Sequence, residues 1–367
     1  MRSVIRNSVG ILDVDLACRF LLACPKLSTL GQVRLEGNRE KTGRFMAALS
    51  NHNGLEALSL DEPVFSEAIN LQHFPSSLKI LHIDSWEDME NAGMISDIGK
   101  RCPQLESISL DCNTFDVLSG ILSSTKGSLK SLKIVSERNI FDQLLNISLC
   151  SLVQKVDMSD VYWSSENLSG PIFKAILDLP NLCELSLRLA GEDIERFMSI
   201  LDVKRREGSV MRRLRRLDIA EYELHNWKRT LSEGEAVCMT GIMPNLQFLT
   251  LPSRGYEEEE EEEMPMMSLS SKGLLQVLML CSNMRQVVLD SQGIKWEFDL
   301  NIDSDTVRKK SINGTFEVCV DLEDEQVSFA MEARQLAPDL QLIRCNRKDL
   351  QFSDVEDAPP FDALSLD

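Results

Sequence analysis

Residues 102–111 read CPQLESISLD, and the fold can be predicted from this segment and its repeats. It holds a Cys-Pro lead, then Leu105, two residues, Ile108, one residue and Leu110. Aliphatic residues two apart are typical of a strand with one buried face. Pro103 cannot continue a helix, so it marks the turn before that strand. The stretch therefore predicts a turn followed by a short, half-buried strand.

The same unit recurs along the chain at a spacing of about 25 residues, which widens toward the C-terminus. One copy would mean little in a leucine-rich chain, whereas an ordered series indicates a repeat architecture. The first apolar residue of each copy is Leu30, Leu55, Leu78, Leu105, Leu129, Val153, Leu182, Leu214, Leu246, Met284 and Leu340.

Helical patterns separate the predicted strands, as at Phe45–Leu49, Val117–Leu122, Ile172–Leu177 and Ile194–Leu201. A unit of strand, turn and helix cannot bury its apolar face alone, so neighbouring units must stack. We therefore predict an α/β solenoid with a parallel inner sheet and helices on the outside.

The repeats resemble the leucine-rich-repeat (ribonuclease-inhibitor-like) superfamily over roughly residues 15–346, which implies a horseshoe-shaped solenoid that binds proteins. The Cys-Pro leads and uneven repeats resemble the repeat region of fungal F-box/leucine-rich-repeat proteins. That resemblance implies a substrate-recognition subunit of an SCF-type ubiquitin ligase, with a ligase adaptor as partner. Residues 1–23 show no F-box, the module that would dock to the ligase. A free-standing scaffold or adaptor, and a regulator of a small GTPase, are the alternatives.

The sequence predicts four structural segments along the chain. The apolar pattern of Leu16, Phe20 and Leu21 predicts a capping helix at the N-terminus. The alternating runs Ile294–Leu300 and Phe316–Leu322 predict a C-terminal hairpin that covers the edge of the sheet. The ranges are 1–29 for the capping helix, 30–291 for the repeats with a disordered acidic loop at 255–268, 292–352 for the hairpin, a helix and the last repeat strand, and 353–367 for a disordered acidic tail.

The residues between the aliphatic positions should line the concave face of the sheet in rows. Counted from the leucine, the seventh position is acidic in the first four units, which predicts a docking surface for a basic segment of a partner. The alternative is a solvated sheet face. Ile80 is an aliphatic where a polar residue is the default. The candidate protein-binding residues are Glu36, Asp61, Asp84, Asp111, His82, Lys133, Lys155, Arg188, Arg216 and Phe248.

Charge and cysteine content limit the function classes. The net charge of -19 argues against nucleic-acid binding, which needs Lys and Arg to displace counterions. Ten cysteines without a CxxC pair indicate reduced thiols in the cytoplasm or nucleus, and no apolar run is long enough for a membrane span. The basic stretch Lys204–Arg216 resembles a nuclear-localisation signal in charge alone. Its alternative is a loop between repeats that balances nearby acid.

No motif for chemistry is visible in the sequence. The histidines His52, His73, His82 and His225 have no metal-ligand spacing, and neither a GxxxxGK[ST] phosphate loop nor a GxSxG elbow occurs. We therefore expect a protein that is not an enzyme, with no catalytic residue, no metal and no cofactor.

Overall fold

The computed structural model divides the chain into two compact units, Met1–Arg188 and Leu189–Asp367, and each is described by itself. The described residues are 12–35, 39–61, 71–86, 96–112, 117–136, 144–161, 169–189, 191–221, 233–251, 277, 280–281, 286–289, 314–319, 340–345 and 348–350.

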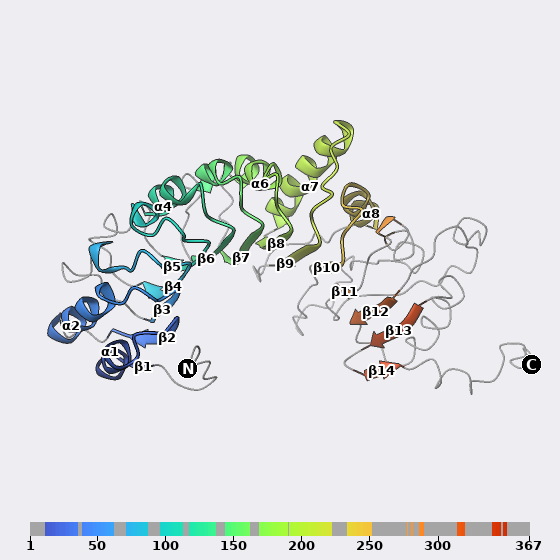
Figure 1. Ribbon diagram of the computed structural model, residues 1–367. Coiled ribbons are helices and arrows are strands. Elements are labelled where there is room, and N and C mark those ends of the chain that lie inside the picture. The colour runs from blue at the N-terminus through green and yellow to red at the C-terminus, as the bar shows by residue number, and fades with distance from the viewer. Residues whose placement is uncertain are drawn as a thin grey trace, which may run out of the picture. The chain divides into compact units, whose positions relative to one another are not determined.

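The first unit is a parallel sheet whose strands pair in chain order. Its helices lie along one side of the strands (Figure 1). The strands are β1 (Leu12–Asp13), β2 (Thr29–Arg34), β3 (Ala57–Asp61), β4 (Ile80–Trp86), β5 (Ser107–Cys112), β6 (Ser131–Ser136), β7 (Lys155–Val161) and β8 (Glu184–Leu189). The helical segments are α1 (Val14–Ala23), α2 (Arg39–Ser50), η1 (Leu71–His73), α3 (Ile98–Arg101), α4 (Val117–Thr125), η3 (Leu145–Leu149) and α6 (Ser169–Leu177).

In the second unit, helix and strand alternate from α7 to β10. Strands β9 to β13 pair in parallel, and β14 is antiparallel to β13. Its elements are α7 (Gly191–Arg206), β9 (Arg216–Glu221), α8 (Glu233–Ile242), β10 (Phe248–Leu251), β11 (Gln286–Leu289), β12 (Gly314–Cys319), β13 (Leu340–Cys345) and β14 (Lys348–Leu350). The prediction of a parallel sheet with alternating helices is confirmed.

The aliphatic positions of the repeat form the core. In β6, Leu132 and Ile134 are fully buried, whereas Ser131, which precedes them, and Lys133, which lies between them, are only half-buried. Burying such a side chain stabilises the fold by about 1.5–3 kcal/mol. Because neighbouring strands are in register, each aliphatic row stacks on the next, and Leu132 lies beside Ile108 and Val156.

Cysteine in the turn before a strand has a structural role. The Sγ of Cys102 donates to the carbonyl of Pro75 at 3.3 Å, and that of Cys150 donates to Leu122 at 3.4 Å. Each bond joins one repeat to the preceding one. His52 makes the equivalent contact, with Nε2 3.1 Å from the carbonyl of Cys24. A small side chain with a weak donor suits this buried turn, which explains the recurring cysteine leads.

The register predicted for the first repeat is wrong. Leu30 pairs with Leu58 and Val33 with Leu60, so Gly31 is an extra residue that forms an irregularity in β2. Leu27, which is buried, therefore takes the place of the leading leucine. The lead Cys24-Pro25-Lys26 is followed directly by Leu27, as Cys102-Pro103-Gln104 is by Leu105.

The predicted N-terminal helix is present as α1, but the face proposed for it is wrong. Val14, Ala17 and Leu21 are buried, whereas Leu16 is 43% exposed. A short strand, β1, precedes the helix and pairs with Val33 and Arg34. Two residues are too few for a periodic pattern, so the sequence did not indicate this strand.

At the C-terminus, the second alternating run contains β12 and the last predicted strand is β13. Strand β12 pairs in parallel with β11 on one side and with β13 on the other. The first run of the predicted hairpin, Ile294–Leu300, lies outside the described residues, as do the acidic loop 255–268 and the tail 353–367. The hairpin cap therefore stays a prediction. Among the described residues, no helix is long and apolar enough to cross a membrane.

Candidate protein-binding face

The face of the sheet opposite the helices is called the open face here, and in the first unit two complete rows of side chains belong to it. Both rows follow from the observed register. The third-position row is Thr29, Ala57, Ile80, Ser107, Ser131, Lys155 and Glu184; the fifth-position row is Gln32, Ser59, His82, Ser109, Lys133, Asp157 and Ser186.

Ile80 is the exposed large hydrophobic residue of strands β2 to β6, among the side chains that the structure describes. Its side chain is 48% exposed, and its direct neighbours are Ala57 and Ser107. His82, the next residue along β4 on the same face, lies between Ser59 and Ser109. A large aliphatic therefore stands among small side chains, where a partner could approach the strands closely.

Strands β6 to β8 carry charged residues that pair with one another. The Nζ of Lys133 lies 3.5 Å from a carboxylate oxygen of Asp160 and 4.0 Å from one of Asp157. Lys155 pairs with Glu184 at 3.2 Å. The predicted binding residues Lys133 and Lys155 thus belong to charge pairs, so this part of the open face is nearly neutral.

The acidic stripe is not arranged as the sequence predicted. The residue beside Asp61 in the seventh-position row is Arg34, and Glu36 lies outside the described residues. The Nε of Arg34 is 3.0 Å from Asp61, whose carboxylate is buried. Asp84 follows in register on β4, and an irregularity after Ile83 separates it from Asp111, which is half-buried on β5. The row thus begins with an ion pair instead of two carboxylates, because Gly31 shifts the register.

The remaining predicted residues lie farther along the chain. Arg188, half-buried, is near the end of β8 in the first unit. In the second unit, the guanidinium of Arg216 lies 5.6 Å from the ring centroid of Phe248, on the adjacent strand. It also lies 3.9 Å from Asp218. Phe248 is therefore partly covered by a cation, which makes it a poorer apolar anchor than Ile80.

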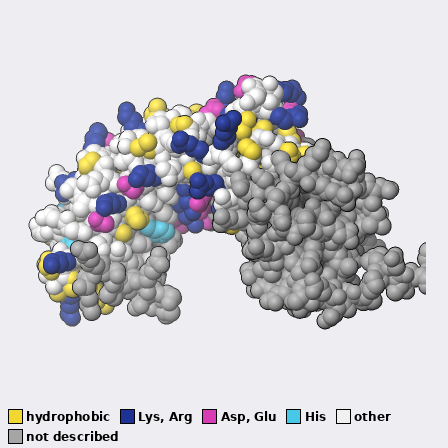
Figure 2. Space-filling view, turned by 45° about the vertical axis from the view of Figure 1, so that its right-hand side comes forward, with side chains coloured by type: hydrophobic (Ala, Val, Ile, Leu, Met, Phe, Trp, Pro, Cys, Tyr) yellow, Lys and Arg dark blue, Asp and Glu magenta, His cyan; other side chains and the backbone are white. Residues whose placement is uncertain are grey.

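Ion pairs also line the strand starts in the first unit. Lys79 pairs with Glu56 at 2.8 Å, and Lys130 pairs with Glu106 at 2.9 Å, each across neighbouring strands. Figure 2 shows Lys and Arg side chains distributed over the described surface, with acidic side chains beside several of them. Both partners of each pair are the residues that directly follow the leading leucine of their repeat, a position that was not predicted to pair.

The described residues hold no group of three metal-ligating side chains. Cys102 and Cys150 are buried, and burial raises the pKa of the Cys102 thiol to about 12 and that of Cys150 to about 11. Such thiols stay protonated at neutral pH and are poor nucleophiles. Both cysteines therefore act in packing.

No protein-family model matches the chain, and no curated protein matches it in sequence. The fold and the open face define the class of the protein as a repeated α/β architecture with a parallel sheet.

Proposed function

We propose that the chain is a non-enzymatic protein-interaction module of the leucine-rich-repeat class, and that it binds its partner through the open face of the first unit. The observation that carries this proposal is the exposed side chain of Ile80 among Ala57, Ser107 and His82. An apolar side chain at the centre of a polar face resembles an interface centre with its polar rim.

The surroundings of Ile80 support this assignment. The small neighbours leave room for a partner side chain against the isoleucine, and its burial would contribute about 1.5–3 kcal/mol at most. The paired charges Lys133–Asp160 and Lys155–Glu184 lie on strands farther along the same face. Such pairs would contribute to specificity more than to affinity.

The proposal includes a specific architecture, in which the α/β repeats stack as a leucine-rich-repeat solenoid. It is supported by the described strands, each of which pairs with its neighbours in chain order, and by the turn hydrogen bonds from one repeat to the preceding one, as from Cys102 to the carbonyl of Pro75. A solenoid is held together by this kind of nearest-neighbour contact.

The setting that we propose is substrate recognition for an SCF-type ubiquitin ligase in the cytoplasm or nucleus. It rests on the resemblance of the Cys-Pro leads and uneven repeats to F-box/leucine-rich-repeat proteins. The cysteines whose side chains are described carry free thiols, which suits a reducing compartment. A scaffold without a ligase link is the alternative, since it needs the same face and no adaptor.

Quantitative affinity purification from cells tests the binding face. The tagged chain is compared with Ile80→Asp and with Leu149→Asp, a matched control in the same unit. Leu149 is 50% exposed and lies in η3, among the helical segments. We expect a defined set of proteins to be lost with Ile80→Asp and retained with Leu149→Asp, and their direct binding is then measured with purified proteins. Equal recovery with both variants would contradict the proposal.

The same experiment separates the two settings. Recovery of a cullin-ligase adaptor with the wild-type chain and with Ile80→Asp supports the ligase role, because adaptor and substrate would use different surfaces. Loss of partners with Ile80→Asp and no adaptor in any sample favours the scaffold.

A further inference from the structure

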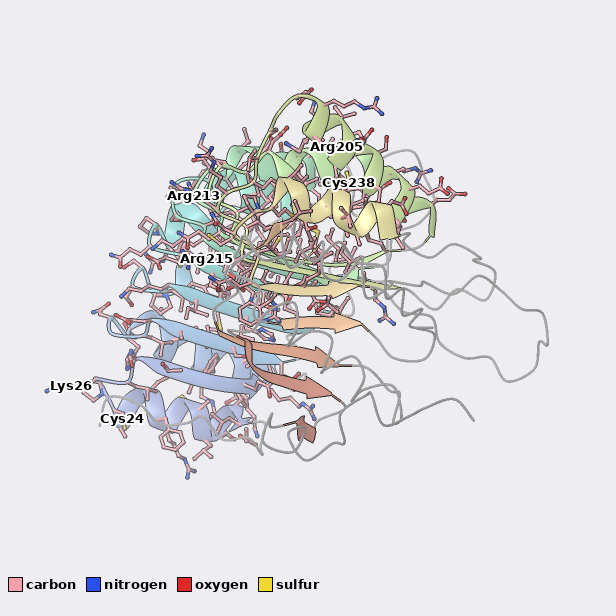
Figure 3. All side chains as sticks on the ribbon, turned by 90° about the vertical axis from the view of Figure 1, so that its right-hand side faces the viewer. Cys24, Lys26, Arg205, Arg213, Arg215 and Cys238 are labelled. Atoms are coloured by element: carbon pink, nitrogen blue, oxygen red, sulfur yellow. The ribbon has the colours of Figure 1, made fainter. Side chains whose placement is uncertain are left out.

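A dense group of arginines lies in the second unit, at the turn between α7 and β9. From Lys204 to Arg216 the only acidic residue is Glu207. We call Arg212, Arg213 and Arg215 the arginine turn, and all three are exposed. Figure 3 shows Arg213 and Arg215 on the same side, where β9 begins, and Arg205 at the end of α7.

The arginine turn differs from the other turns that precede a strand. Their last two residues include at most one basic side chain, as in Pro103-Gln104, Pro180-Asn181 and Pro244-Asn245. In the first unit, the charged residue after the leading leucine is paired across strands, as in Lys79–Glu56. Arg215 occupies this position in the second unit, and its neighbour in the next repeat is Gln247. No described side chain neutralises Arg212 or Arg215.

The backbone of the arginine turn is held firmly. Three hydrogen bonds join its backbone to the next repeat. The N–H of Met211 donates to the carbonyl of Ile242 at 2.8 Å. The backbone carbonyls of Arg212 and Arg215 accept hydrogen bonds, each of 2.8 Å, from Nδ2 of Asn245 and from the N–H of Gln247, respectively. Leu214 is fully buried between the arginines. The three guanidinium groups therefore start from a preorganised backbone, which lowers the entropy lost when they bind.

The buried Leu214 also bears on the nuclear-localisation alternative. An import receptor takes up such a signal as an extended peptide, and Leu214 would have to leave the core for that. Arg205 and Arg206 both pair with Asp202, so the charge of the α7 end is partly compensated. The charges of Arg212 and Arg215, which no described side chain neutralises, lie in the folded turn.

We propose that the arginine turn is a second docking surface, separate from the open face, and that it takes an acidic protein segment rich in Asp and Glu. Arginine presents donors in a planar fork that matches carboxylate geometry, so Arg212 and Arg215 on one turn can each hold a carboxylate. At physiological salt, charges beyond about 8 Å are largely screened. The turn can therefore attract an acidic segment although the whole chain carries a net charge of -19.

The probe for this surface is a fluorescein-labelled polyglutamate peptide, whose binding to the full chain is followed by fluorescence anisotropy. The test variant is Arg212→Gln/Arg213→Gln/Arg215→Gln. The matched control, Lys26→Gln/Lys126→Gln/Lys174→Gln, removes the same charge from exposed sites in the first unit. We expect the test variant to bind about tenfold more weakly and the control to bind like the wild type. Equal weakening in both variants would mean that bulk charge alone attracts the peptide, and the proposal would be overturned.

Further measurements test the identity of the bound segment and the position of its binding site. A fluorescein-labelled duplex DNA that binds as tightly as the peptide would overturn the assignment to a protein segment. Binding that emerges only after deletion of Glu257–Glu263 would make the chain's own glutamate run the occupant, and would also overturn it. If the triple variant melts early, Arg212→Gln/Arg213→Gln, which keeps Arg215 beside the start of β9, replaces it. Unchanged peptide binding by Ile80→Asp is expected, since the open face is a different surface.

Discussion

Arg34 and Asp61 form an ion pair between adjacent strands, with the Nε of Arg34 3.0 Å from Oδ2 of Asp61. The two residues are opposite each other in the sheet because Gly31 adds one residue to β2. The carboxylate is buried, so the pair stabilises the sheet, and Asp61 is not available as an exposed carboxylate for a basic partner. This arrangement changes the meaning of the acidic row that the sequence suggested.

Arg34→Met should lower the free energy of unfolding by about 1–3 kcal/mol, because it leaves the buried Asp61 carboxylate without its cation. Urea unfolding of the variant measures the loss. Lys79→Met is the control, since the Lys79–Glu56 pair is exposed and screened by solvent, so its loss should change the free energy of unfolding much less. Equal effects of the two substitutions would show that the Arg34–Asp61 pair has no special role.

Leu185→Asp should lower the free energy of unfolding by several kcal/mol, since Leu185 is fully buried in β8 and an aspartate there would have no partner. Ser186→Asp, one residue along the same strand and on the open face, should change it by about 0.5 kcal/mol or less. Thermal unfolding followed by circular dichroism compares the two. Similar melting of both variants would contradict the alternation of faces in β8.

Gly99→Ala should destabilise the first unit strongly. A Cβ at Gly99 would lie 2.1 Å from the carbonyl oxygen of Ser124, and this backbone atom cannot move aside easily. Gly43→Ala has open space around the added carbon and lies within α2, so it should stabilise by about 0.5–1 kcal/mol. Chemical unfolding should thus shift in opposite directions for the two alanines, and a shift in the same direction would refute the close approach at Gly99.

Alkaline pH should destabilise the fold through its buried thiols. Burial raises the pKa of Cys102 from 9.0 to about 12 and that of Cys150 from 9.0 to about 11, so the unfolded chain releases these protons first. Between those values the unfolded state binds fewer protons, and the free energy of unfolding therefore falls as pH rises above 9.0. Urea unfolding at about pH 8 and about pH 10 should show a larger loss for the wild type than for Cys102→Ala/Cys150→Ala. Equal losses would remove the two thiols as the cause.

The repeat pattern was sufficient to predict most strands of the first unit. Leu105, Ile108 and Leu110 are all buried, as expected from their spacing, and the same holds for the equivalent residues of β6 and β8. The pattern failed at the first repeat, where Leu30, Val33 and Leu35 imitate the spacing of the unit. The Cys24-Pro25-Lys26-Leu27 lead carried the correct alignment, because the turn before a strand is held by hydrogen bonds to neighbouring repeats.

The pattern within a single strand predicts which residues share the open face, but it does not predict which of them form ion pairs. The sequence indicated that Ile80 and Lys133 belong to the same face, because alternation along a strand is a local property of the backbone. It did not show that Lys133 pairs with Asp160, because an irregularity in β7 brings Asp160 beside Val135. Pairing partners depend on register between strands, and a single extra residue changes it.

The parallel α/β repeat could be predicted from the amino-acid sequence, because the spacing of leucines and turn residues indicates which side chains must be buried. The folded arrangement was needed to see which charges neutralise one another, as for Arg34 and Asp61, and which remain exposed, as at Arg212 and Arg215. The physical reason is that burial of apolar side chains follows local periodicity, whereas ion pairs form between strands far apart in sequence, across distances of a few ångströms that the register sets.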